Sequence, residues 1–164
     1  MNDSQRLSVL ILFAVAMGYI EAMVVVYLRW LIPVPEWPSI STYKDLCAFI
    51  RNAGIMWSEQ TREFATIVML FCVAFLFGRN TREKLASFLI AFGIWDIFYY
   101  VFLYLWLRWP ENLFVWDVLF LIPCPWVSPV IIPVCASIVM ITAGFYLLLH
   151  RVQKQKEKGY GEKV

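Results

Sequence analysis

Four long apolar runs constrain the fold of this 164-residue chain more than any other feature. An apolar run of about 20 residues is long enough to cross the hydrocarbon core of a bilayer as a helix. Hydrophobic residues make up 62% of the chain and charged residues 16%, against about 25% charged in soluble domains. The sequence therefore predicts an all-α polytopic integral membrane protein, with little length left for a soluble domain.

Prolines, glycines and charged residues divide the apolar sequence into four predicted transmembrane helices. Pro33 ends the first helix, Gly78 ends the second and Pro110 ends the third. The predicted helices comprise residues 7–32, 59–78, 84–109 and 130–150. Together they form a single transmembrane helical domain over residues 1–150, followed by a charged cytoplasmic tail at 151–164.

Two features concern the connections and the packing of these helices. Charged and apolar positions between Thr42 and Gly54 follow helical spacing, which predicts a short amphipathic helix on the membrane interface. Asn80 and Glu83 resemble the N-terminal cap of the third transmembrane helix. The first helix also carries a stripe of small residues at every fourth position, which lets another helix approach closely. This stripe consists of Ala14, Gly18 and Ala22.

The region from residue 112 to 150 is too long for a single crossing, because it would measure about 58 Å as one helix. Prolines break it at positions 123, 125, 129 and 133. We predict a half-helix over residues 112–122, a proline-rich turn, and then the last transmembrane helix. The half-helix either re-enters the membrane beside a polar site or lies along its surface, and the sequence leaves both alternatives open.

The distribution of basic residues predicts the orientation of the chain. With four crossings, both termini lie on the same side of the membrane. Nine basic residues fall on that side, which are Arg6, Arg79, Arg82, Lys84, Arg151, Lys154, Lys156, Lys158 and Lys163. Five fall on the other side, which are Arg29, Lys44, Arg51, Arg62 and Arg108. Because basic loops stay in the cytoplasm, we expect a cell-membrane protein with both termini cytoplasmic.

Four carboxylates inside apolar sequence are the best lead to function. A carboxylate in a bilayer span is costly, and such a residue is read first as a site. With a helical rise of 1.5 Å per residue, three of them are predicted to lie about 18–22 Å from the cytoplasmic ends of their helices, and the fourth, Asp117, reaches the same depth if the half-helix dips into the membrane from the outside. They are Glu21, Glu63, Asp96 and Asp117. The four acids therefore share one predicted layer, although the sequence does not show whether they face one another.

Several groups could neutralise these acids. Arg62 lies at nearly the same predicted depth, and Arg29 lies near the outer interface, from which it can reach down. Tyr100 lies one turn from Asp96 on the same helix face and offers a hydroxyl donor. Carboxylates without imidazole favour hard cations, so any metal is expected at Glu21, Asp96 and Asp117.

Other sites are not expected from this sequence. The single histidine, His150, lies at the opposite side of the membrane from the acids, which removes the usual haem, zinc and copper ligand sets. No phosphate-binding or dinucleotide-binding glycine motif is present in the sequence, and the formal charge of +2 does not indicate a nucleic-acid partner. The four cysteines are expected as small buried hydrophobic residues, with a Cys47–Cys124 disulfide as an alternative for one pair.

Three functions remain open, and the sequence identifies no catalytic residue. The first is a small membrane protein that binds or moves a cation, a proton or a small solute at its carboxylates. The second is an accessory or structural subunit, with a second copy or a membrane complex as its partner besides the lipid bilayer. The third is a metal-dependent intramembrane enzyme acting on a lipid or isoprenoid phosphate, which Arg29, Arg62 and Arg108 would clamp.

Overall fold

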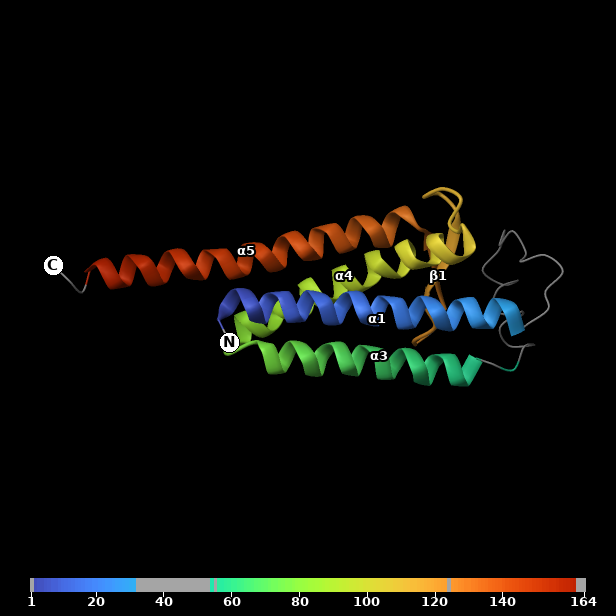
Figure 1. Ribbon diagram of the computed structural model, residues 1–164, viewed down its shortest axis with the longest axis horizontal. Helices are drawn as coiled ribbons and strands as arrows, with labels where there is room; N and C mark the ends of the chain where they lie inside the picture. The colour runs from blue at the N-terminus through green and yellow to red at the C-terminus, as the bar shows by residue number, and fades with distance from the viewer. Residues whose placement is uncertain (1, 32–53, 55, 124, 162–164) are drawn as a thin grey trace.

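The computed structural model describes residues 2–31, 54, 56–123 and 125–161, with the backbone alone from residue 150 onward. The described part is mostly helical, and its long helices lie along one direction (Figure 1). They are α1 (Asp3–Leu31), α3 (Met56–Phe77), α4 (Thr81–Leu107) and α5 (Ile131–Gly161). All four are long and apolar enough to span a membrane, α5 over its part Ile131–Leu149. These helices correspond to the four predicted from the sequence.

The chain enters and leaves the bundle at the same end. In Figure 1, α1 begins and α5 ends on the left, and α5 continues beyond the other helices there. We call this the terminal end of the bundle, and we call the opposite end the hairpin end. The helix of α5 does not stop at the predicted boundary near His150 but continues to Gly161.

The helix boundaries follow from local capping. α1 begins before the predicted start at residue 7 because Asn2 and Gln5 form a reciprocal cap, with Gln5 N donating to Asn2 Oδ1 at 2.7 Å and Asn2 N donating to Gln5 Oε1 at 3.0 Å. The predicted cap of α4 is confirmed, because Glu83 N donates to the Asn80 side chain at 3.0 Å. Such bonds satisfy N–H groups that have no partner inside the helix.

The predicted half-helix over residues 112–122 is wrong. This region contains a two-stranded antiparallel hairpin made of β1 (Trp116–Phe120) and β2 (Trp126–Pro129). The strand pairing matches Asp117 with Ser128 and Val118 with Val127, and it is irregular between Val118 and Phe120. The prediction of an all-α fold is therefore corrected to a helical bundle with one hairpin, which lies across the helices near the hairpin end (Figure 1).

The prolines and the side-chain types explain why this region forms strands. A helix between closely spaced prolines would leave most of its backbone groups at unpaired ends, whereas strand pairing satisfies them. The strands are rich in Trp, Val and Phe, which favour extended backbone. Pairing continues past the strands through Val130 N to Val115 O at 3.0 Å and Ile131 N to Leu113 O at 2.8 Å. Pro133 then lies in the first turn of α5, where its missing N–H is tolerated.

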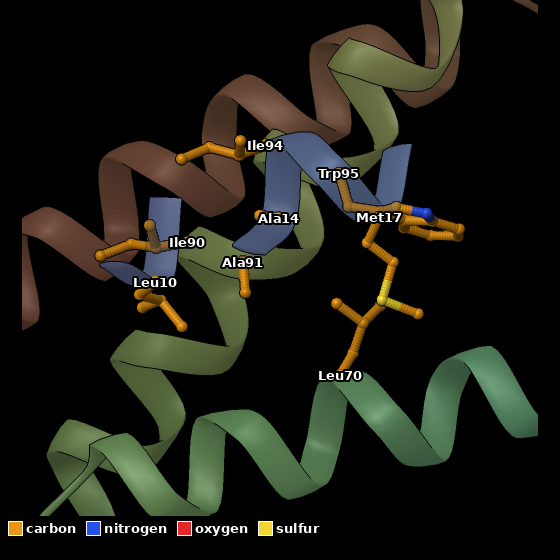
Figure 2. Packing of buried hydrophobic residues seen from close by; sticks show 8 residues of the cluster. All are labelled: Leu10, Ala14, Met17, Leu70, Ile90, Ala91, Ile94 and Trp95. Carbon is orange, nitrogen blue, oxygen red and sulfur yellow. The ribbon is translucent and has the colours of Figure 1, made fainter. Parts of the chain in front are cut away.

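The core lies around α4, which packs against α1, α3 and α5. Figure 2 shows how side chains of α1 and α3 gather against α4. The cluster consists of the buried residues Leu10, Ala14, Met17, Leu70, Ile90, Ala91, Ile94 and Trp95. Gly18 of the predicted small-residue stripe lies against the backbone of α4, because a Cβ built there would be 2.8 Å from Trp95 O. The stripe therefore packs inside the bundle.

Some predictions concern residues outside the described ones. The amphipathic helix between Thr42 and Gly54 and the Cys47–Cys124 disulfide both depend on such residues. The other two cysteines, Cys72 and Cys135, are free and exposed. They are therefore not the buried residues that we expected, because the helix faces that carry them are turned outward from the core.

Candidate functional site

An ion-pair set joins α1 to α3 and neutralises Glu21. The guanidinium of Arg62 pairs with Glu21 through Nη1 and with Glu59 through Nη2, the second pair at 2.7 Å. Thr66 Oγ1 lies 3.4 Å from Glu21 Oε2 and 3.1 Å from the carbonyl oxygen of Arg62, so its proton is shared between two acceptors. The structure thus contains the predicted pairing of Arg62 with an acid of the layer. Because Arg62 binds both Glu21 and Glu59, the three charged groups together carry one net negative charge.

Glu63 has a different kind of partner. Its carboxylate accepts a hydrogen bond from the backbone N–H of Leu121, with 2.7 Å from Leu121 N to Glu63 Oε2. Gln60, one turn earlier on α3, donates its side-chain N–H to the carbonyl oxygen of Leu121 at 3.0 Å. Leu121 is 5% exposed and Glu63 is 8% exposed, so this contact between α3 and the end of β1 is buried.

Asp117 on β1 meets Tyr100 on α4, a tyrosine that the sequence placed on the helix face of Asp96. Tyr100 Oη donates to Asp117 Oδ2 at 2.9 Å. Burial raises the pKa of Asp117 to about 6, and the negative charge of Asp96 also raises it. The hydrogen bonds from Tyr100 and from the Val118 backbone lower this pKa, and so does the positive charge of Arg29. The burial of Asp117 therefore favours its protonated form more than water does.

Asp96 is held by α5. Ser137 Oγ donates to Asp96 Oδ2 at 2.7 Å, and Ser137 itself is 2% exposed. Asp96 lies one helical turn before Tyr100, and its charge acts on Asp117 and on Tyr100. Asp96 and Asp117 thus form an interacting pair of acids, with a hydroxyl group bound to each of them.

Arg29 and Tyr99 connect the two charged regions. The guanidinium carbon of Arg29 lies 4.4 Å from the centre of the Trp109 ring, and its charge acts on Asp117. The charges of Glu21, Asp117, Arg29 and Arg62 all act on Tyr99. Tyr99 therefore lies between the ion-pair set on α1 and α3 and the acid pair on α4 and β1.

In the structure, each of the four acids of the predicted layer has a different partner. Glu21 has Arg62, Glu63 has the Leu121 backbone, Asp96 has Ser137 and Asp117 has Tyr100. Within the ranges that the structure describes, no group of three Asp, Glu, His or Cys side chains could hold a metal ion. The expectation that Glu21, Asp96 and Asp117 would share a hard cation thus has no support from these contacts.

Sequence reasoning missed four polar partners, which are Glu59, Gln60, Thr66 and Ser137. Of these, only Glu59 could have been predicted from the sequence as a partner of Arg62, because it lies three residues earlier on the same helix face. Ser137 is a single small polar residue in an apolar helix, and its role depends on how α5 is rotated against α4. The helical periodicity of α5 alone does not fix that rotation.

No protein-family model, no curated protein and no solved structure matches this chain. The candidate site therefore has to be interpreted from its own chemistry.

Proposed function

We propose that this chain is a multi-pass protein of the cell membrane with both termini in the cytoplasm. Four helices of sufficient length and apolarity support membrane insertion. The shared position of the termini at one end of the bundle fits an even number of crossings (Figure 1). Among the residues that the structure describes, eight basic ones belong to segments at that end and three to segments at the other, which favours placing the terminal end in the cytoplasm.

Within the membrane, the function that the site supports best is the binding and movement of a proton at Asp96 and Asp117. One observation carries this proposal. The charge of Asp96 acts on Asp117, and the side-chain hydrogen bonds to these two acids come from the hydroxyl groups of Ser137 and Tyr100 rather than from cations. A hydroxyl group can donate to the ionised acid or accept from the protonated one, whereas a direct ion pair holds the acid ionised.

The charge balance of this pair favours a single bound proton. Two ionised carboxylates against the one guanidinium of Arg29 leave one negative charge in a poorly hydrated region. One proton removes that charge without the cage of oxygen ligands that a divalent cation needs. A monovalent cation or a small cationic solute would balance the same charge, so these ligands are tested in the same assay.

The test measures proton flux in proteoliposomes that contain the full-length protein and a pH-sensitive dye, with a potassium diffusion potential as the driving force. We expect the double variant D96N/D117N to lose about tenfold or more of the flux, because both proton-binding groups are gone. Y100F should retain part of the flux, since it removes a hydrogen bond and keeps both acids. Parallel runs with sodium outside identify a cation-dependent movement.

The matched control is D3N, which removes an acid from the terminal end of the bundle. Asp3 pairs with Arg79 at 2.9 Å and its side chain is 80% exposed, so it is remote from the proposed proton site. D3N should retain the wild-type flux. Equal flux from wild type and D96N/D117N, with both proteins folded and inserted, would refute the proposal.

The contacts of the arginines argue against the enzyme alternative. A phosphate clamp needs guanidinium groups directed at the substrate. Arg62 already binds two carboxylates, and Arg29 lies over Trp109. Arg108 forms the C-terminal cap of α4 and lies 5.8 Å from the Tyr104 ring centre. The accessory-subunit alternative stays a prediction.

A further inference from the structure

Two side chains of α3 hold one peptide unit at the end of β1. Gln60 donates to the carbonyl oxygen of Leu121, and Glu63 accepts from its N–H group. These are the two main-chain groups that a neighbouring strand would use in a sheet. Gln60 and Glu63 are three residues apart and so lie on one face of α3. We call this pair of side chains the α3 clamp.

The clamp is connected to the proposed proton site through a short and well-packed strand. Leu121 directly follows β1, and Asp117 lies in the same strand. Between them, the ring of Phe120 packs against Phe92 at 6.2 Å and Trp95 at 6.4 Å between ring centres. β1 is therefore attached to α3 at one end and to α4 along its length.

We propose that Gln60 and Glu63 are positioning residues, which hold β1 so that Asp117 stays against Tyr100 and close to Asp96. This inference rests on the proposed proton site, although the hold on the hairpin can be measured separately. Without the clamp, the end of β1 loses its hydrogen bonds to the side chains of α3, and Asp117 is free to move away from Tyr100 toward water.

The role assigned to Glu63 is that of a hydrogen-bond acceptor. Charged groups act on it from Arg62 and Glu59 of its own helix and from Glu21 of α1. On α4 and the hairpin, the charge of Asp96 acts on Asp117. Because a glutamine oxygen also accepts from an N–H group, E63Q keeps the clamp, whereas E63L and Q60L each remove one of its bonds.

The first measurement is an infrared titration of the carboxyl groups in full-length protein in nanodiscs. Difference spectra against D117N isolate the titration of Asp117. We expect E63L and Q60L to increase its acidity about tenfold toward the usual aspartate range, because Asp117 gains water. E63Q should titrate like wild type. E59Q is the matched control, since Glu59 lies on the same helix but bonds to Arg62.

The second measurement follows the hairpin itself with two spin labels. The labels replace the exposed residues Trp126 on β2 and Met69 on α3, in a chain whose native cysteines are changed to serine. We expect a single narrow distance distribution in wild type, E63Q and E59Q, and a broadened one in E63L and Q60L. Unchanged distributions in E63L and Q60L would overturn the clamp.

The two measurements separate the possible failures. If the distance distribution broadens but Asp117 titrates unchanged, the clamp holds the hairpin and its positioning role is wrong. If E63Q behaves like E63L, the charge of Glu63 matters and its role as acceptor is refuted. If Asp117 does not titrate in wild type, the proton site fails, and the distance distributions alone decide whether the clamp exists.

Discussion

At the scale of single residues, each acid of the predicted layer has a different kind of partner. Glu21 uses a guanidinium, Glu63 a backbone N–H, and Asp96 a serine hydroxyl. Asp117 combines a tyrosine hydroxyl with the more distant charge of Arg29. A guanidinium stabilises only the ionised form, whereas a hydroxyl tolerates both forms. We therefore expect the acids held by hydroxyl groups to be the ones that exchange a proton.

Asp117 makes stability depend on pH in a definite direction. Its pKa in the folded protein is about 6 because burial raises it above the usual value of 3.8. The folded state therefore binds more protons than the unfolded state between about pH 4 and pH 6, and stability falls as pH rises through that window. The loss amounts to at most about 3 kcal/mol and is complete above the folded pKa.

The measurement is the melting temperature of the protein in detergent from pH 4 to pH 8, compared with D117N. The wild type should lose stability relative to D117N between pH 4 and pH 6, and the difference should then stay constant. A difference that is flat over the whole range would show that Asp117 titrates normally, and one that rises with pH would show that folding lowers its pKa.

At the scale of elements, close helix contacts depend on residues without bulky side chains. Gly18 of α1 lies against Trp95 O of α4, and Gly93 of α4 lies against Ser137 O of α5, where a built Cβ would be 2.7 Å away. The second contact adjoins the bond between Ser137 and Asp96. Close packing of α4 against α5 therefore places the serine hydroxyl within reach of the acid.

Whether G18A raises or lowers stability tests the close contact of α1 with α4. In an unconstrained helix, changing Gly to Ala stabilises by roughly 0.5–1 kcal/mol. At Gly18 the added methyl group would lie 2.8 Å from Trp95 O, so the helices must separate. We expect G18A to destabilise by about 1–3 kcal/mol instead, as overpacking does in cores.

Unfolding in detergent measures this effect. L12A is a suitable comparison because Leu12 of the same helix is 68% exposed, and its removal should change stability by less than about 0.5 kcal/mol. A stabilised G18A variant would mean that α1 and α4 are not in close contact in solution.

At the scale of the whole molecule, the two ends of the bundle differ in the polar groups that they carry. The terminal end carries the ion pair of Asp3 on α1 with Arg79 in the link between α3 and α4, and the contact of Arg6 on α1 with the carbonyl oxygen of Phe77 on α3. The hairpin end carries the acids and their partners. A proton path from the hairpin end would therefore meet Asp117 and Asp96 before it reaches the apolar core of Figure 2.

This arrangement predicts the result of a topology experiment. Reporter fusions at the C-terminus and in the link between α3 and α4 should both report the cytoplasm, because these points share the terminal end with the basic residues. Green fluorescent protein should fluoresce there, and alkaline phosphatase should be inactive. A fusion between α4 and β1 should give the opposite pattern. Active alkaline phosphatase at the C-terminus would refute the proposed orientation.

The sequence by itself determined the four long helices and most of their limits. Apolar length is a property of the chain alone, and the cap at Asn80 depends on residues three positions apart. The acids were also identifiable from sequence, because a carboxylate in an apolar run is costly wherever it packs. Arg62 could be named as a partner of an acid from its depth, and Tyr100 as a hydroxyl donor, although helix face placed Tyr100 beside Asp96 and the structure pairs it with Asp117.

Only the tertiary structure decided how the acids are paired and what the region after α4 becomes. A short apolar segment has no periodicity that separates helix from strand, so the hairpin followed from pairing between residues 116–120 and 126–129. The bonds from Ser137 to Asp96 and from Gln60 to Leu121 depend on helix rotation and on the position of the hairpin. Such contacts join residues 41 and 61 positions apart, and local sequence carries no information about them.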